Sequence, residues 1–129
     1  MQAVKHILVV ENETTLRELL EFLLRREGYT VTAVSDGDYA KQLLEKLNGI
    51  DLVILDLLLP IMSGRQLLRW IRRQCETADT PILVLTDLQN DDDVADALDE
   101  GANDYMIKPF QPKELQARIR KLLRIKKEL

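Results

Sequence analysis

The strongest constraint on the fold is a regular alternation of short apolar runs with longer segments of helical periodicity. The apolar runs span about residues 5–10, 29–34, 51–55, 81–86 and 103–107. This alternation is typical of a parallel sheet covered by helices on both faces. A chain of 129 residues with 46% apolar content suits one hydrophobic core. We therefore expect a single doubly wound α/β domain over residues 1–129.

Polar side chains stand just past four of these runs, where strands are expected to end. They are Glu11, Asn12 and Glu13 after HILVV, Asp56 after DLVIL, Thr86 after PILVL, and Lys108 after DYMI. Parallel strands bring such groups to one edge of the sheet, where open α/β sheets bind ligands. A carboxylate flanked by acids, a hydroxyl and an ammonium suits a metal ion and a phosphoryl group.

Composition argues against several other function classes. The net charge of −4 argues against a nucleic-acid surface on the domain, so no direct nucleic-acid partner is expected. No apolar stretch approaches the roughly 20 residues that span a bilayer, and the first apolar run is too short for a signal peptide. The only cysteine, Cys75, can form no internal disulfide. We expect a cytoplasmic protein with no membrane partner.

Helical periodicity also predicts which side chains face the core. The first helix carries a leucine stripe at residues 16, 19, 20, 23 and 24 that should face the sheet, and the third carries Leu67, Leu68, Ile71 and Cys75 inward. The last helix, about 111–129, has Leu115, Ile119, Leu122 and Leu129 in positions that suit either an ordinary amphipathic helix or a short heptad seam with Lys126. It has no stop signal, which is compatible with a chain that continues into an output domain. Asp91, Asp92 and Asp93 are expected to begin a helix rather than bind metal.

The segments HILVVENE, DLVILDLLLPIMSG, PILVLTD and GANDYMIKPF occur in the order and at the spacing of a known family. Over essentially its whole length, the chain resembles the receiver domains of bacterial two-component response regulators. The resemblance implies a flavodoxin-like (βα)5 fold with strand order 2-1-3-4-5. It implies a signalling switch rather than an enzyme, with a histidine kinase or phosphotransfer protein upstream and an output domain or protein downstream.

The resemblance also implies roles for individual residues. Asp56 would accept the phosphoryl group, Lys108 would contact its oxygens, and Thr86 with Tyr105 would relay the switch. An aspartate can take this role only if a hard cation and a nearby lysine offset its charge. A cis Lys108–Pro109 bond, common in the family, is plausible because proline follows the lysine.

A Mg²⁺ or Mn²⁺ site is the cofactor that the resemblance implies. Its ligands would be Glu11, Asn12, Asp56 and the backbone carbonyl of Leu58. The family usually has an aspartate where Asn12 stands, so one charge is lost and we expect weak metal binding. The longer Glu11 is expected to reach in and compensate.

Three further positions depart from the family's usual pattern. Leu58 and Leu88 occupy the two places that tune hydrolysis of the acyl phosphate in this family, and apolar groups there should hinder an attacking water. Asp87 replaces a residue that is usually small, and it would repel a phosphoryl group if it turned toward the site.

Two functions therefore remain open from the sequence: a phosphorylation-dependent switch, and a phosphorylation-independent receiver that acts as a protein-interaction module. Asn12 and Asp87 keep the second open. A phosphatase or dehalogenase is disfavoured because Leu58 stands where such enzymes need a second acid. The resemblance implies that Asp104, Glu114 and Arg118 would lie on a face that receivers of the transcription-factor type use to dimerise. Because Val94 stands where a cation is often found there, we expect a monomer or weak homodimer.

Overall fold

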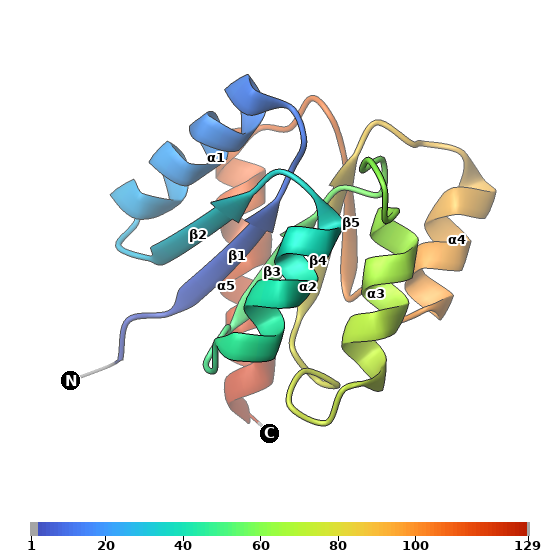
Figure 1. Ribbon diagram of the computed structural model, residues 1–129. Coiled ribbons are helices and arrows are strands. Elements are labelled where there is room, and N and C mark those ends of the chain that lie inside the picture. The colour runs from blue at the N-terminus through green and yellow to red at the C-terminus, as the bar shows by residue number, and fades with distance from the viewer. Residues whose placement is uncertain (1–2, 129) are drawn as a thin grey trace.

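The computed structural model describes residues 3–128, with side chains described as far as Arg124. Within this range five strands alternate with five helices (Figure 1). In chain order they are β1 (His6–Val10), α1 (Thr14–Arg26), β2 (Thr30–Val34), α2 (Gly37–Lys46), β3 (Leu52–Leu55), α3 (Gly64–Arg73), β4 (Ile82–Thr86), α4 (Asp91–Asp99), β5 (Asp104–Ile107) and α5 (Pro112–Glu128). The elements follow the predicted alternation closely.

All strand pairs are parallel, and the sheet has the order β2-β1-β3-β4-β5. This confirms the doubly wound fold and the predicted strand order. Val10, the last residue of β1, is in register with Val34 on one side and Leu55 on the other. The strands therefore end together, and the segments that follow them meet at one edge of the sheet.

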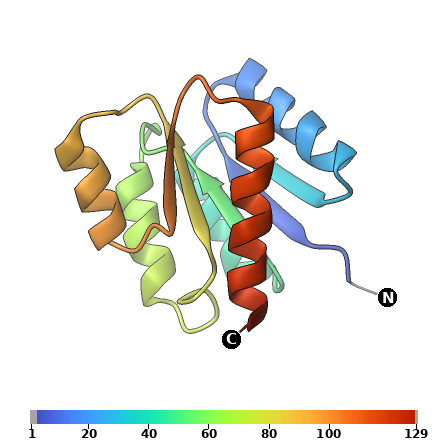
Figure 2. The same cartoon turned by 180° about the vertical axis from the view of Figure 1, so that it is seen from behind.

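Helices cover both faces of the sheet. Helices α1 and α5 lie on one face and α2, α3 and α4 on the other, as the two opposite views show (Figures 1 and 2). Successive strand residues alternate between the layers: Leu8 and Val10 join the core under α2 and α3, whereas Ile7 and Val9 join the core under α1 and α5. This alternation is the period of two expected of a strand, and it explains why the central runs are apolar throughout.

Two predictions about helix faces are corrected by the structure. Cys75 is exposed, because α3 ends at Arg73 and the apolar periodicity does not continue into the turn that follows. On α1, Leu20, Leu23 and Leu24 are buried as predicted, but Leu19 is 45% exposed. The apolar stripe of α1 is therefore wider than its contact with the sheet.

The last helix is an amphipathic helix of the core. Leu115, Ile119 and Leu122 are buried against the sheet, so they are not a seam left free for a second helix. Leu129 and the side chain of Lys126, the other members of the expected seam, lie outside the described residues. Among the helices of residues 3–128, none is long and apolar enough to cross a membrane.

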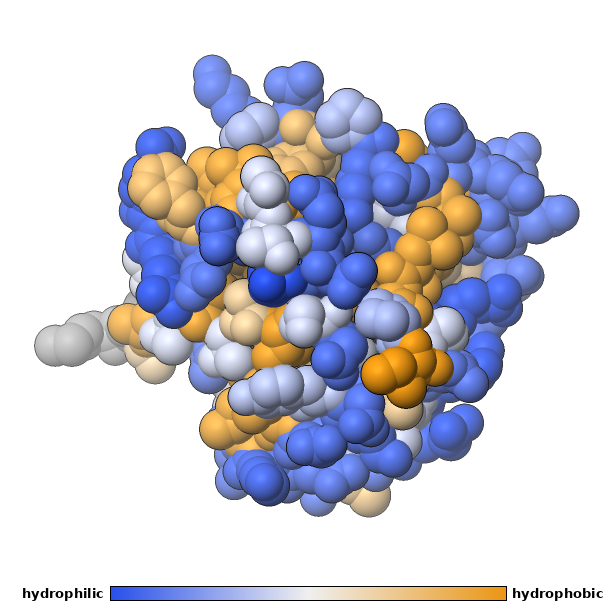
Figure 3. All heavy atoms as spheres, turned by 45° about the horizontal axis from the view of Figure 1, so that its top comes forward, coloured by the Kyte–Doolittle hydropathy of each residue, from blue (hydrophilic) through white to orange (hydrophobic). Residues whose placement is uncertain are grey.

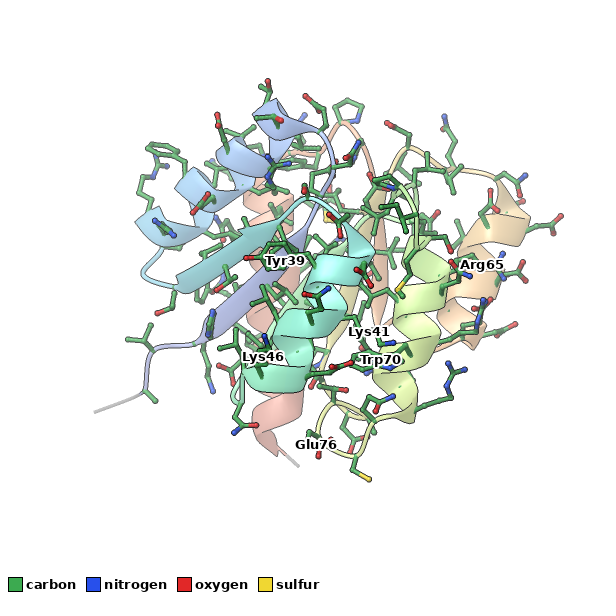
Figure 4. The ribbon with its side chains drawn as sticks, in the orientation of Figure 1. Tyr39, Lys41, Lys46, Arg65, Trp70 and Glu76 are labelled. Atoms are coloured by element: carbon green, nitrogen blue, oxygen red, sulfur yellow. The ribbon has the colours of Figure 1, made fainter. Side chains whose placement is uncertain are left out.

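Arginines on α3 hold the end of α4. Arg65 and Arg69 both bind the carboxylate of Glu100, the C-cap residue of α4, and Figure 4 shows Arg65 reaching from α3 toward α4. One turn further along α3, Arg72 donates hydrogen bonds to the carbonyl oxygen of Gly101 at 2.8 and 3.0 Å. Gly101 has φ +119°, and a Cβ there would lie 2.8 Å from Nε of Arg72, so the turn requires glycine. The C-terminal end of α4 is thus fixed to α3.

Candidate functional site

Asp56 follows the last residue of β3, and both its backbone and its carboxylate make hydrogen bonds. Its side chain is only 5% exposed. The backbone N–H of Asp56 donates to the carbonyl of Val10 at 3.1 Å, which ties it to β1. Carboxylate Oδ1 accepts a hydrogen bond from the N–H of Leu58 at 3.0 Å, and Oδ2 lies 2.6 Å from Nζ of Lys108. Both oxygens of the carboxylate are therefore oriented before any ligand arrives.

A close backbone approach fixes the loop that follows Asp56. The N–H of Gly64, at the start of α3, donates to the carbonyl of Leu57 at 3.0 Å. A Cβ at Gly64 would lie 2.2 Å from the backbone oxygen of Asp56 and 2.5 Å from Cα of Leu57. Only glycine permits this approach, so the loop folds tightly over Asp56 because of the residue at position 64.

Lys108 bridges two acidic residues. Its side chain is 12% exposed, and Nζ lies 2.6 Å from Asp56 Oδ2 and 2.8 Å from Glu11 Oε1. Burial alone would lower the pKa of Lys108, but hydrogen bonds to Asp56 and Glu11 outweigh it and raise the pKa above its ordinary value. Lys108 is therefore charged at neutral pH. The Lys108–Pro109 peptide bond is cis, as predicted.

Glu11 has turned toward Lys108. Its side chain is 4% exposed, and Oε2 accepts a hydrogen bond from the N–H of Glu13 at 3.0 Å. Burial raises the pKa of Glu11 above its ordinary value, against the lowering effect of the hydrogen bond from Lys108. Glu11, Lys108 and Asp56 form a buried arrangement, hereafter the ion triad, in which one ammonium serves two carboxylates.

A cavity of about 570 Å³ opens above the ion triad. The polar and charged residues that line the cavity are Glu11, Asn12, Glu13, Asp56, Asp87 and Lys108. Its apolar lining residues are Leu16, Leu19, Leu58, Pro109, Phe110 and Pro112. Figure 3, which brings this edge of the sheet forward, shows apolar side chains gathered over α1 beside a hydrophilic area. A ligand at Asp56 would thus meet both charged groups and apolar side chains.

The oxygen donors in the cavity suit a hard divalent cation. Asp56 supplies a carboxylate and Asn12 an amide oxygen, and Glu11 and Glu13 line the same space. Within residues 3–128 no three His, Cys, Asp or Glu side chains are grouped to hold a metal ion. Mg²⁺ does not need such a cage, because it usually binds through one or two carboxylates and keeps several waters. The donor set therefore fits Mg²⁺, although Glu11 is engaged with Lys108.

Thr86 ends β4 with a buried hydroxyl. The residue is fully buried, and among the described residues its Oγ1 has no hydrogen-bond partner. Tyr105, on the neighbouring strand β5, donates its hydroxyl to the carbonyl oxygen of Leu88 at 2.7 Å. Burial, followed by the charges of Asp93 and Asp56, raises the pKa of Tyr105. An unsatisfied buried hydroxyl is unusual and calls for an explanation, such as a ligand oxygen.

The structure separates the three positions expected to tune hydrolysis. Leu58 and Asp87 both line the cavity, and Leu58 is 53% exposed. Leu88 packs partly buried against the core under α2 and α3 and is not among the residues that line the cavity. Its backbone carbonyl instead holds Tyr105. Leu58 and Asp87 thus face a ligand at Asp56, whereas Leu88 contacts the predicted switch residue.

Arg17 is a contributor that the sequence did not indicate. From the first turns of α1 its Nη1 donates to the carbonyl oxygens of Glu11 at 3.0 Å and Asn12 at 3.1 Å. No sequence motif marks such a contact, because every residue offers a backbone carbonyl.

Comparison with known proteins agrees with this geometry. The family model described as the response regulator receiver domain matches residues 7–120. The chain is 39% identical over 120 residues to the phosphate regulon transcriptional regulatory protein PhoB of Klebsiella pneumoniae, covering 93% of this chain and 52% of that protein. It is 44% identical over 121 residues to the transcriptional regulatory protein GltR of Pseudomonas aeruginosa, covering 93% and 49%.

Comparison with a solved structure also indicates a receiver domain. The receiver domain of a sensor histidine kinase from Pseudomonas aeruginosa PAO1 superposes with a TM-score of 0.86 at 35% identity, covering 94% of this chain and 98% of that one. That structure is described as having a magnesium ion coordinated in the active site cleft.

The chain belongs to the response regulator receiver domain family, the signalling switches of two-component systems, and not to a class of conventional enzymes. It spans about half the length of the curated relatives that it matches.

Proposed function

We propose that this domain is a phosphorylation-dependent switch in which Asp56 accepts a phosphoryl group from a histidine kinase or phosphotransfer protein. The observation that carries the proposal is the placement of Asp56. Its carboxylate is buried, is oriented by the N–H of Leu58, and lies 2.6 Å from the Lys108 ammonium at the floor of an open cavity.

The chemistry follows from charge and position. A carboxylate oxygen of Asp56 forms a bond to phosphorus as the bond between phosphorus and the donor's imidazole nitrogen breaks, and that nitrogen keeps the electron pair. Lys108 is within reach of the new phosphoryl oxygens, which offsets part of the added charge. A bound Mg²⁺ would supply further neutralisation, held by Asp56, Asn12 and the backbone carbonyl of Leu58.

The switch would pass through Thr86. Its buried hydroxyl lacks a partner in the resting site, and a phosphoryl oxygen on Asp56 would accept its hydrogen bond. Thr86 is linked along the chain to Leu88, whose carbonyl holds the Tyr105 hydroxyl. A shift of this loop would therefore move Tyr105 and the start of α4, whereas the end of α4 stays bound to α3 through Glu100.

The apolar residues that line the cavity are the surface that a phosphoryl donor must meet. Leu16 and Leu19 of α1 and Phe110 border the opening above Asp56, and Leu19 is 45% exposed. A donor whose histidine reaches Asp56 would cover these side chains and remove them from water. The exposed part of the α1 stripe thus gains a role in recognition of the kinase.

Incubation with acetyl phosphate and Mg²⁺, followed by intact mass and peptide mapping, tests the proposal. The wild type should gain one phosphoryl group, and Asp56→Asn should gain none. Asp87→Asn is the matched control, because it removes a second carboxylate at the same cavity and should still gain one phosphoryl group on Asp56. Modification that persists in Asp56→Asn would refute the assignment.

The alternative is a receiver that binds partners without phosphorylation. The engagement of Glu11 by Lys108 and the neutral Asn12 favour it, since both reduce the charge available to a cation. A wild type that is unmodified by acetyl phosphate, and that does not bind beryllofluoride with Mg²⁺, would support this alternative.

Assembly and output are part of the proposal. Arg118 is bound within the chain to Asp104 at 2.9 Å and Glu114 at 3.0 Å, so these charges are already satisfied on one copy. We expect a monomer or weak dimer of the unmodified domain, which sedimentation can check. The regulator names of relatives twice as long suggest an output domain linked to α5 in the natural chain.

A further inference from the structure

Three successive carbonyl groups of the loop between β1 and α1 are bound by one residue. Nη1 of Arg17 donates to the carbonyl oxygens of Glu11 at 3.0 Å and Asn12 at 3.1 Å. The backbone N–H of Arg17 donates to the carbonyl oxygen of Glu13 at 2.9 Å. This is the loop that supplies Glu11, Asn12 and Glu13 to the cavity.

The loop contributes residues to the cavity and backbone oxygens to Arg17. The residues Glu11, Asn12 and Glu13 line the cavity, whereas Arg17 is not among the lining residues and binds the loop through backbone oxygens alone. Glu13, the N-cap residue of α1, makes no side-chain capping hydrogen bond. Glu11 is also held by Lys108, by the N–H of Glu13 and through its own N–H by the carbonyl of Val34, whereas Arg17 binds the carbonyl oxygens of both Glu11 and Asn12 from α1.

Electrostatics alone does not explain an arginine at this place. Cations are unfavourable near the N-terminus of a helix, where the dipole is positive. A cation in the cavity would also be repelled by a guanidinium that binds the same loop. The charge of Arg17 thus acts against both the helix dipole and a bound metal ion, whereas its hydrogen bonds to two carbonyl oxygens restrain the geometry of the loop.

We infer that Arg17 is a positioning residue that fixes the loop so that the Asn12 side chain is oriented for a divalent cation before it binds. The inference rests on the proposed function, since it assumes that the cavity takes Mg²⁺. A neutral amide attracts the cation less than a carboxylate does, so affinity depends more strongly on the ligand already being in place. Arg17 therefore restores part of the Mg²⁺ affinity that is lost because Asn12 carries no charge.

The two physical effects of Arg17 predict opposite results when its charge is removed. Arg17→Met keeps much of the apolar stem and removes the guanidinium. If only charge mattered, the variant would bind Mg²⁺ more tightly. If positioning dominates, it binds more weakly, by about tenfold, at the lower end of the effect typical of residues that orient metal ligands. Arg17→Lys keeps the charge and one donor group, and should recover part of the affinity.

The test is a Mg²⁺ titration of the whole domain followed by amide chemical shifts, with hydrogen exchange of the Asn12 and Glu13 amides as a second measurement. Arg26→Met is the matched control: Arg26 is on the same helix, and its guanidinium lies 5.7 Å from the Phe22 ring. We expect weaker Mg²⁺ binding and faster loop exchange in Arg17→Met only. In the Asn12→Asp background the Arg17→Met effect should be smaller, because a carboxylate depends less on preorganisation.

The outcomes separate the inference from the proposed function. Equal or tighter Mg²⁺ binding by Arg17→Met, with a wild type that binds, overturns the inference and leaves the proposed function intact. A wild type that does not bind Mg²⁺ overturns the cation site of the proposed function, and the inference falls with it. If Arg17→Met lowers Mg²⁺ affinity equally in the wild-type and Asn12→Asp backgrounds, Arg17 does not act by orienting Asn12.

Discussion

Removing the Lys108 ammonium is the most direct perturbation of the ion triad. Lys108→Met would leave the carboxylates of Glu11 and Asp56, which are 4% and 5% exposed, without their shared cation. Breaking a buried ion pair by removing one partner costs about 3–5 kcal/mol, because an uncompensated charge stays buried. Each carboxylate retains one backbone N–H, from Glu13 and Leu58, and the raised pKa of Glu11, caused by burial, eases its protonation. We therefore expect a loss near the lower end, about 3 kcal/mol.

Urea unfolding at pH 7 with a chelator present measures this loss. In thermal unfolding of a domain of this size, the same loss of free energy of unfolding corresponds to a fall in Tm of about 10 °C. Asp56→Asn in the Lys108→Met background should recover roughly half of the lost stability, since one buried charge then remains. Lys41→Met is the control, because Lys41 lies over the Trp70 ring at the surface between α2 and α3 (Figure 4) and should contribute at most about 1 kcal/mol.

Either of two results would refute the reasoning. A loss below about 1 kcal/mol for Lys108→Met would mean that water reaches the carboxylates and screens them as at a surface. Strictly additive effects of Lys108→Met and Asp56→Asn would mean that the two residues do not interact energetically. In both cases the 2.6 Å contact would not describe the resting site.

Three further outcomes are expected. Asn12→Asp adds a charged oxygen ligand and should bind Mg²⁺ more tightly by calorimetry; unchanged affinity would mean that Glu11 or Glu13 already completes the site. Leu58→Asn places a hydrogen-bonding group at the cavity and should hasten decay of the Asp56 phosphate about fivefold, equivalent to about 1 kcal/mol of barrier, and a lifetime equal to wild type would end the shielding argument. The hydrogen bond from Arg65, and then that from Arg69, lowers the pKa of Glu100. The stability that ionised Glu100 contributes to the fold is therefore present above its unfolded pKa of about 4.3 and is lost as pH falls through its folded pKa. In urea unfolding, Glu100→Gln should therefore cost up to about 1 kcal/mol at pH 7 and little at pH 3, and a cost independent of pH would contradict this.

The residues that the sequence predicts best are those whose position depends on strand register alone. Asp56, Thr86 and Lys108 each follow a strand of a parallel sheet, and parallel strands end at one edge. Their convergence therefore needs no knowledge of side-chain direction. The apolar runs predict the strands for the same reason, because strands buried on both faces leave few polar positions.

The sequence is less informative about the partners of a side chain and about where a helix ends. Metal binding by Glu11 stays a prediction, and its contact with Lys108, a partner 97 positions away in the chain, was not predicted. Cys75 continues the apolar period of α3, but the helix ends at Arg73 and the turn exposes the cysteine. Arg17 acts on backbone carbonyls, which carry no sequence signal.

Under the proposed function, two groups of the resting site, the Thr86 hydroxyl and the Lys108 ammonium, gain hydrogen bonds on phosphorylation. The free energy of these new bonds drives the switch. The hydroxyl of Thr86 is buried with no hydrogen-bond partner among the described residues, and an unsatisfied polar group of this kind costs about 1–3 kcal/mol. The Lys108 ammonium is divided between Asp56 and Glu11. A phosphoryl group on Asp56 brings about two negative charges and three acceptor oxygens, which is what both groups lack. Gaining these bonds moves Thr86 and the loop that carries Leu88, and the contact from Leu88 to Tyr105 transmits the change to α4 and β5.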